Sequence, residues 1–299
     1  MLRTFSILVL LASLLGLVSP LLTPLFNSLP TLAWLLDLAS HWQWLYALLL
    51  VLSTLLLTTK QKIWLLALSA LALPFLTAAP PLPTVQASVK PLKVISSNVY
   101  FENSDLSRLK NLATVEQADL VVILEFTAKQ AEQVKTWTDY PYQILQPSRD
   151  PFGMAILSRF PLSQTEMLTD QAGIQHISTQ VEYTQPIKLI GFHPLPPMTA
   201  DLYRARDAIL QQLTKDHQQP TLIAGDFNAS PWSSAFSGLS AKGFARSMNL
   251  MPTWPSNFKG LMGIPIDQVL ASPQWKLLKA KRGDNIGSDH YPIIVELSL

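Results

Sequence analysis

Two short polar motifs in the C-terminal half of the chain combine residue types that can do acid–base chemistry. The first, Gly225-Asp226-Phe227-Asn228, directly follows the apolar run 221–224. An acid and an amide two positions apart on an extended segment point the same way. Asp226 can therefore orient or deprotonate a water, while Asn228 holds that water or a phosphoryl oxygen. Taken in isolation, the motif still favours a simpler interpretation, an Asx turn after a strand.

The second motif, Gly287-Ser288-Asp289-His290-Tyr291-Pro292, sets an acid beside an imidazole. Histidine changes its charge near neutral pH and can also donate to a phosphoryl oxygen. It does both best when a carboxylate fixes its tautomer, and Asp267 in the run 266–270 is the candidate partner of His290. The alternative for an Asp-His pair alone is an ordinary surface loop.

Polar residues of catalytic type follow four apolar runs that are typical of strands. Residues 92–96 lead to Asn98, 120–124 to Glu125, 187–192 to His193, and 221–224 to Asp226 and Asn228. An unpaired buried carboxylate is costly, so Glu125 at the edge of a buried sheet favours a cation as its partner. Mg²⁺ takes one or two carboxylates together with waters and substrate phosphate, which fits the scarce oxygen ligands here. An exposed glutamate at a strand end is the equally weighted alternative.

The spacing of apolar residues in the same half predicts an α+β fold. Strands are also expected at 154–157, 177–183, 266–271 and 293–297, and helices at 106–115 and 202–213. Many strands and few helices favour two packed sheets flanked by helices. The chain has no cysteine, which excludes disulfides, thiolate nucleophiles and cysteine-based zinc sites.

The distribution of charge divides the chain into two unlike pieces. Hydrophobic residues make up 48% of the sequence and charged residues only 14%. Residues 1–89 contain just four charged side chains, Arg3, Asp37, Lys60 and Lys62. Without these four, the totals of 22 basic and 20 acidic residues leave equal numbers of each sign in the remainder. A protein that binds nucleic acid mainly through phosphates usually carries a basic excess, which this piece lacks.

Residues 1–79 are predicted to form a transmembrane region of about three helices. The apolar stretches 5–26, 42–59 and 63–79 approach the roughly 20 residues that cross a bilayer, although a cleaved signal peptide is the alternative for the first. Segment 27–41, which contains Pro30 and Asp37, is expected to be a short interfacial helix. Nearby aromatic side chains are expected to contact lipid at headgroup level and receive no ligand: Trp34, Trp42, Trp44 and Tyr46.

The basic residues of this region predict an orientation. Arg3, Lys60 and Lys62 should stay cytoplasmic, which places the rest of the chain outside. Residues 80–91 are rich in proline and are interpreted as an extended linker, and residues 92–299 as the catalytic domain. The expected location is therefore the inner or plasma membrane, with an extracytoplasmic catalytic domain.

In this order the motifs resemble the endonuclease/exonuclease/phosphatase superfamily of deoxyribonuclease I-like metal phosphoesterases. The resemblance covers residues 93–296 and rests on a series of short elements, each weak alone. They are Asn98 in 95–99, Glu125 after its apolar run, the segment 153–161, His193-Pro194, the segment 225–228, Ile266-Asp267 and the segment 288–290.

The resemblance implies a four-layer αββα sandwich with the site at one end. It places Glu125 and Asn98 at a magnesium ion, with manganese as the alternative metal, and adds Asp289 as a further ligand. It places Asp226 and Asn228 at the attacking water. His290, paired with Asp267, and His193 would flank the scissile phosphate, and water would attack in line with the metal neutralising charge.

Three functions remain open at this level. Nuclease-like hydrolysis of phosphodiesters stands first because the family is rich in nucleases. A phospholipid or inositol-phosphate phosphoesterase at the membrane surface is the alternative, favoured by the apolar region and the neutral catalytic domain. A membrane-bound binding module without catalysis is disfavoured, because no acid or imidazole of the pattern is missing. No obligate protein partner is inferred beyond the lipid bilayer and a phosphoester substrate.

Two further groups of residues allow more than one interpretation. The basic run Lys276, Lys279, Lys281 and Arg282 could contact phosphate, but a solvated face is the favoured interpretation. The apolar residues after Asn228 could form a substrate rim, but a minor core is favoured. They are Trp232, Phe236, Met248, Met251, Trp254 and Phe258.

Overall fold

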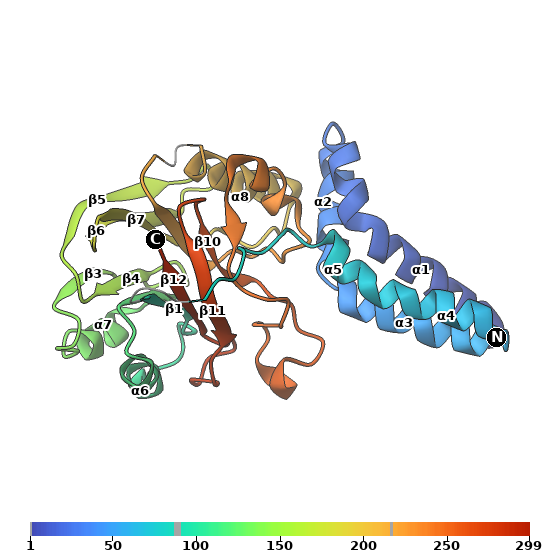
Figure 1. The fold of residues 1–299 in the computed structure, drawn as a ribbon, viewed down its shortest axis with the longest axis horizontal. Helices are drawn as coiled ribbons and strands as arrows, with labels where there is room; N and C mark the ends of the chain where they lie inside the picture. The colour runs from blue at the N-terminus through green and yellow to red at the C-terminus, as the bar shows by residue number, and fades with distance from the viewer. Residues whose placement is uncertain (1, 87–90, 216–217) are drawn as a thin grey trace.

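Two six-stranded mixed sheets form the C-terminal part of the molecule (Figure 1). The computed structural model describes residues 2–86, 91–215 and 218–299. The first sheet has the order β11 (Lys276–Arg282), β12 (Ile293–Ser298), β1 (Leu92–Asn98), β2 (Leu120–Leu124), β4 (Met154–Ser158) and β3 (Tyr142–Gln146). The second has the order β5 (Leu162–Thr169), β6 (Gln175–Glu182), β7 (Pro186–Phe192), β8 (Thr221–Asp226), β10 (Asp267–Ala271) and β9 (Ala245–Arg246).

Helices cover the outer faces of both sheets. The core between the sheets contains fully buried side chains of both, such as Val94 and Val122 from the first and Leu189 and Leu222 from the second. The first sheet also packs against α6 (Ser107–Glu116) and α7 (Ala128–Val134), and the second against α8 (Ala200–Leu213) and η3 (Ser234–Phe236). Two short turns, η4 (Ser240–Lys242) and η5 (Asn257–Gly260), follow. The predicted α+β class with two sheets and flanking helices is confirmed.

All the strands that the sequence patterns predicted are present. The strands that these patterns did not predict have few buried side chains. β5 is mostly exposed, and β3 has no fully buried residue. The basic run forms β11, an edge strand of the first sheet. Lysines on an edge strand discourage pairing with other chains, which explains why this strand carries charge in place of an apolar pattern.

Strand direction brings the polar strand ends to one edge of the sandwich. β1 runs parallel to β2, and β7 parallel to β8, so their carboxyl ends lie together. β10 runs antiparallel to β8 and begins opposite its end, with Asp267 facing Asp226 in the register. Asn98, Glu125, His193 and Asp226 at strand ends, and Asp267 at a strand start, therefore share one edge.

A bundle of helices precedes the sandwich and projects from one side of it (Figure 1). It comprises α1 (Leu2–Leu22), η1 (Thr23–Phe26), α2 (Pro30–Ser40), α3 (Gln43–Leu57), α4 (Gln61–Ser69), η2 (Ala70–Ala72) and α5 (Leu73–Thr77). The short helix expected between 27 and 41 is present as α2. α1 and α3 pack together through Leu17, Ala47 and Leu50.

The prediction of about three transmembrane helices is wrong. Within the described residues, only Leu2–Phe26 is long and apolar enough to cross a membrane by itself. α2 and α3 pass that test only as a pair bent by 74°, and Gln61–Thr77 is too short. The helices that form in the apolar stretches 42–59 and 63–79 are shorter than the length needed to cross a membrane, since α3 has only 15 residues.

The helical bundle is attached to the sandwich by buried polar contacts. The Asp37 carboxylate of α2 accepts a hydrogen bond from Arg206 of α8 at 2.9 Å and another from the Ser234 backbone N–H at 2.7 Å. Both charged side chains are buried. The Trp34 indole, predicted to contact lipid, donates to the Pro197 carbonyl at 2.7 Å. Asp37 is therefore a docking residue of the bundle.

The described part of the proline-rich segment lies against the sheets. The Leu82 N–H donates to the Arg246 carbonyl at 2.8 Å, and the Val85 N–H donates to the Leu277 carbonyl at 2.9 Å. Leu82 is buried in the core between the sheets. Residues 87–90 of the predicted linker 80–91 lie outside the described residues. Residues 80–86 are extended, as expected, and they pair with two strands over residues 81–85.

Candidate active site

All eight residues that the sequence singled out lie at the same edge of the sandwich. A cavity of about 460 Å³ is lined there by six of them, and Asn98 and Asp267 lie directly behind this lining. The six are Glu125, His193, Asp226, Asn228, Asp289 and His290. The convergence expected from strand ends far apart in sequence is therefore present in the structure.

Asn98 connects the carboxylates and an imidazole at the centre of the cluster. Its amide nitrogen donates to Glu125 Oε1 at 2.9 Å and to Asp226 Oδ2 at 3.4 Å, and lies 3.5 Å from His290 Nε2. The other Glu125 oxygen accepts the Phe101 N–H at 3.0 Å. Glu125 has a left-handed backbone with φ of 58°, an unfavourable conformation for this residue type that occurs often at functional sites.

The segment 225–228 forms a tight turn at the end of β8. Gly225 passes so close to β7 that an added Cβ would lie 1.8 Å from the Phe192 carbonyl oxygen, so the position requires glycine. The Asn228 N–H donates to Asp226 Oδ1 at 2.8 Å, which is the expected Asx turn. The Asn228 side-chain amide donates to the Pro194 carbonyl at 3.0 Å. The turn therefore lies within the cluster of candidate site residues.

The predicted pairing of His290 with Asp267 is present. His290 Nδ1 lies 2.9 Å from Asp267 Oδ2, and both side chains are buried. The opposite ring nitrogen, Nε2, faces Asp226 Oδ2 at 3.7 Å. His193 Nε2 approaches the same Asp226 oxygen at 3.7 Å from the other side. Asp226 therefore lies between two imidazoles.

Burial and charge give the two imidazoles opposite protonation. Burial lowers the pKa of His290, but the carboxylates of Asp267 and Asp226 outweigh it and raise the value to about 10. Burial lowers the pKa of His193 to about 3, and the neighbouring His290 adds to this effect. Burial raises the pKa of the Asp226 carboxyl to about 7 despite the nearby His290 charge. At neutral pH His290 is cationic and His193 is neutral, a separation typical of groups with different roles in proton transfer.

These shifts predict a bell-shaped pH profile for kcat/KM. As pH falls through about 7, the Asp226 carboxyl gains a proton and can no longer accept one from water, so the rate falls. As pH rises through about 10, His290 loses its proton and the rate falls again. The Asp267 charge raises both pKa values, so Asp267→Asn should move both limbs to lower pH.

The measurement is the pH dependence of hydrolysis of a soluble phosphodiester, with the exposed Asp105→Asn as a matched control. The control should leave both limbs in place. A lower rate for Asp267→Asn with unmoved limbs would contradict the assignment of these groups.

Two carboxylates, those of Asp289 and Glu125, could hold a cation at the mouth of the cluster. Asp289 Oδ2 accepts the Trp254 indole N–H at 3.1 Å, whereas Asp289 Oδ1 is buried and has no hydrogen-bond partner within the described part of the chain. Burial raises the pKa of the Glu125 carboxyl. Because an unpartnered buried carboxylate oxygen is costly, a hard cation suits this donor set.

A second grouping of possible ligands consists of Asp226, Asp267 and His290. Their ligand atoms all lie within 4.8 Å of one another. The Asp267–His290 hydrogen bond occupies one ring nitrogen, and a proton held on the imidazole repels a cation. We therefore interpret this group as a proton-transfer pair beside Asp226 and not as a metal site.

Aromatic residues also line the cavity, of which Phe152 was not identified from the sequence and Trp254 was named only as a possible part of a substrate rim. Phe152 packs against His193 with ring centroids 5.3 Å apart, and Trp254 lies over His290 with centroids 6.2 Å apart. Leu38 and Trp42 of the helical region line the same cavity. The sequence pattern placed Trp42 at headgroup level without a ligand and did not predict its position in the cavity wall. The apolar sequence around Trp42 does not distinguish a side chain in a cavity wall from one that contacts lipid.

The apolar residues after Asn228 divide between core and rim. Trp232, Phe236 and Met248 are buried, as the favoured interpretation expected. Trp254 lines the cavity, and Phe258 is 88% exposed.

A two-sheet sandwich with acids, amides and imidazoles at one edge is the architecture of a known class of phosphoester hydrolases. The profile described as the endonuclease/exonuclease/phosphatase family matches residues 95–290. The chain belongs to this family. Its members act as hydrolases on phosphoester bonds.

Solved structures share the fold at low sequence identity. A humanized D. rerio TDP2 has a TM-score of 0.58 and 16% identity, covering 70% of this chain and 99% of that chain. The 3'-5' exonuclease NExo from Neisseria meningitidis has a TM-score of 0.56 and 17% identity, covering 69% and 100%. An AP endonuclease from Archaeoglobus fulgidus has a TM-score of 0.55 and 16% identity, covering 68% and 98%. No curated protein matches the chain.

Proposed function

We propose that the chain hydrolyses phosphodiester bonds by in-line attack of water, with a divalent cation bound at the edge of the sandwich. The observation that carries this proposal is the single cluster formed by Asn98, Glu125, Asp226 and His290, which come from three strand ends and one loop far apart in sequence. The neighbouring Asp289 and His193 open into the same cavity. Membership of the family supports the reaction class.

We assign Glu125, Asn98 and Asp289 to the cation, which is Mg²⁺ or alternatively Mn²⁺. The donor set is dominated by oxygen and has no cysteine, which suits hard cations. The buried, unpartnered Asp289 Oδ1 is consistent with a missing positive charge. A cation bound by these residues would neutralise the charge that develops on the phosphoryl oxygens.

The remaining residues provide proton transfer and orientation. Asp226, held by the Asn228 N–H, orients the attacking water and accepts its proton. The cationic His290, held by Asp267, donates to a phosphoryl oxygen as charge accumulates there. The neutral His193 lies on the other side of Asp226 and can donate to the phosphate. Asn228 orients the turn through its hydrogen bonds to Asp226 and Pro194.

A soluble aryl phosphodiester tests this reaction without assuming a natural substrate. The full-length protein in detergent should hydrolyse bis(para-nitrophenyl) phosphate with Mg²⁺ or Mn²⁺ and lose this activity when a chelator removes the metal. Restoring the metal should restore the rate. Equal rates with and without chelator would rule out the proposed metal dependence.

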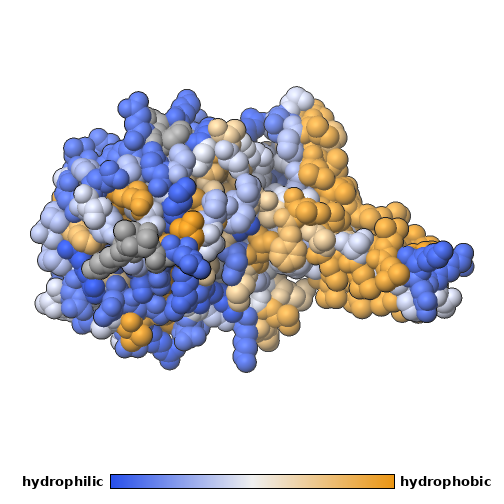
Figure 2. All heavy atoms as spheres, viewed as in Figure 1, coloured by the Kyte–Doolittle hydropathy of each residue, from blue (hydrophilic) through white to orange (hydrophobic). Residues whose placement is uncertain are grey.

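We further propose that residues 1–79 anchor the catalytic domain, residues 92–299, to a membrane, with 80–91 as the connection. The outward surface of the bundle is apolar, and Figure 2 shows hydrophilic residues again at its far tip, where the chain begins. Arg3, Lys60 and Lys62 lie near the helix ends α1, α3 and α4 that meet at this tip. This pattern favours an extracytoplasmic catalytic domain. A reporter fused after Leu299 that works only in the cytoplasm would contradict this orientation.

A further inference from the structure

The catalytic cavity has an apolar wall to which both the helical region and the sandwich contribute side chains. Leu38 and Trp42 come from the helical region, and Met198 and Ile264 come from loops of the sandwich. These side chains share the cavity with Asp226 and His290. The bundle is held in this position by the buried Asp37–Arg206 pair, so the wall is a fixed part of the site.

A second cavity of about 540 Å³ continues this wall away from the catalytic cluster. His41 and Trp42 line both cavities, so the two meet at these side chains. Beyond them the second cavity is bounded by Leu45 and Leu48 of α3 on one side. The loop around η5 bounds the other side, through Phe258, Leu261 and Met262. The two adjoining cavities, together called the apolar groove, thus extend from the catalytic cluster along the helical bundle.

The loop side of this groove exposes large apolar side chains. Phe258 is 88% exposed, Leu261 73% and Met262 64%. Clusters of exposed large apolar residues mark surfaces that contact another molecule or a membrane. The neighbouring helical bundle is also covered by apolar side chains, as Figure 2 shows. The loop and the bundle therefore present apolar surfaces on both sides of the groove.

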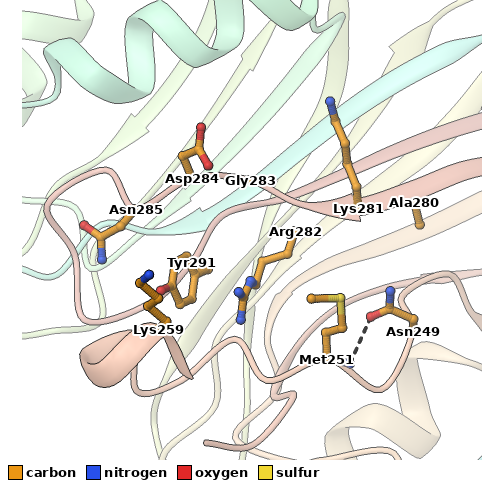
Figure 3. A pocket seen from close by; sticks show the side chains of 10 residues that line it. All are labelled: Asn249, Met251, Lys259, Ala280, Lys281, Arg282, Gly283, Asp284, Asn285 and Tyr291. Carbon is orange, nitrogen blue, oxygen red and sulfur yellow. Dashed lines mark hydrogen bonds between the residues drawn. The ribbon is translucent and has the colours of Figure 1, made fainter. Parts of the chain in front are cut away.

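Two cations border the groove. Lys259 and Arg282 line it together with Met251, and the same three residues line the adjoining pocket in Figure 3. Figure 3 shows Arg282 and Lys281 pointing to opposite sides of their strand.

Arg282 lies over the Tyr291 ring at 4.0 Å and donates to the Pro252 carbonyl at 2.7 Å. Lys281 pairs instead with Glu116 at 2.6 Å. Cations beside an apolar loop are complementary to an anionic membrane surface.

We propose that the substrate is a lipid phosphoester whose phosphate lies at the catalytic cluster and whose acyl chain follows this groove to the bilayer. The proposal rests on the phosphodiester hydrolysis proposed above and specifies its substrate. A polynucleotide has no acyl chain to use the apolar wall, and the catalytic piece lacks the overall basic excess typical of phosphate-gripping nucleic-acid binders.

The reaction balances as a simple hydrolysis. The water oxygen forms a bond to phosphorus while the bond from phosphorus to the leaving oxygen breaks. Asp226 takes the proton of the attacking water, and the leaving oxygen receives a proton from an imidazole of the site. The products are an alcohol and a phosphomonoester, one of which retains the acyl chains.

The test compares three substrates with full-length protein and Mg²⁺. They are a phospholipid in vesicles that contain phosphatidylglycerol, soluble bis(para-nitrophenyl) phosphate, and single-stranded DNA. The triple variant Phe258→Ser, Leu261→Ser, Met262→Ser changes only exposed side chains, and Val115→Ser changes one exposed apolar residue on α6 as a control. The quantity compared is the ratio of kcat/KM for the lipid to that for the soluble diester.

We expect the triple variant to lower this ratio by at least about tenfold, because it removes apolar surface that the lipid would bury. The Val115→Ser control should leave the ratio unchanged. In the wild type, the rate on dispersed short-chain phospholipids should rise with acyl length, and Trp42→Ala should flatten that dependence. A purely structural role of Trp42 would lower all rates without changing their dependence on chain length.

Several results would overturn the proposal. An unchanged ratio in the triple variant excludes the groove, and DNA cleavage more efficient than lipid hydrolysis assigns the site to nucleic acid. Hydrolysis of the soluble diester without hydrolysis of the lipid would reject the lipid substrate but not the phosphodiesterase function. Absence of turnover on all three substrates overturns the hydrolase function on which the proposal rests.

Discussion

Asp226→Asn should lower kcat for bis(para-nitrophenyl) phosphate by about 10³-fold, within the range that general acid–base groups contribute. The substitution keeps the shape of the side chain and its contact with the Asn228 N–H, but it removes the only carboxylate that lies between His193 and His290 among the described residues. An amide cannot take a proton from the attacking water. Steady-state kinetics of the full-length protein at saturating Mg²⁺ would measure the loss.

A stability measurement separates this catalytic effect from a folding defect. Burial raises the pKa of the Asp226 carboxyl in the folded protein above its pKa in the unfolded chain. Once the pH exceeds the pKa of the unfolded chain, the ionised carboxylate therefore destabilises the folded state. The cost grows as pH rises toward about 7, and a neutral asparagine does not carry it. We therefore expect Asp226→Asn to be at least as stable as the wild type above neutral pH. A rate loss that parallels a loss of thermal stability would instead indicate a structural role.

Glu125→Gln should weaken binding of Mg²⁺ or Mn²⁺ by at least about 100-fold, since even supporting residues around metal ligands are worth about 10–100-fold. Glu125 is placed by the Asn98 amide and the Phe101 N–H, both of which donate to its carboxylate oxygens. Glutamine cannot accept both hydrogen bonds and loses the charge that attracts the cation. Calorimetric titration of metal into the metal-free protein would measure the affinity.

Glu102→Gln is the matched control for this substitution. Glu102 is near the site in sequence, is exposed, and accepts a hydrogen bond from the Tyr100 hydroxyl at 2.7 Å. It should bind metal as the wild type does. Equal affinity of Glu125→Gln and Glu102→Gln would show that Glu125 is not a ligand.

The sequence was sufficient to predict which residues meet at the edge of the sandwich. Asn98, Glu125, His193 and Asp226 each follow a buried apolar run, and the parallel pairs β1–β2 and β7–β8 bring such ends together. Asp267 could be proposed as the partner of His290 because an imidazole in this chemistry requires an acid. Local pattern and general chemistry were enough here, because strand direction converts sequence position into a position in space.

The contribution of the helical region could not be predicted in the same way. Trp42 lies in an apolar segment, where a cavity wall and a lipid contact have the same sequence pattern. Asp37 interrupts that segment because it pairs with Arg206, a residue far away in the chain. The expected three spans failed because hydropathy measures composition and not helix length, and the helices within 42–59 and 63–79 are too short to cross a membrane alone. These features depend on long-range packing.

The central claim is that one cation and one phosphate bind together at the cluster of Glu125, Asp226 and His290. Electron paramagnetic resonance of the Mn²⁺-loaded protein with inorganic phosphate tests it directly, through the hyperfine coupling between manganese and phosphorus. We predict a phosphorus coupling in the wild type and in Glu102→Gln that is lost in Glu125→Gln. Bound manganese without any phosphorus coupling, or an unchanged coupling in Glu125→Gln, would contradict it.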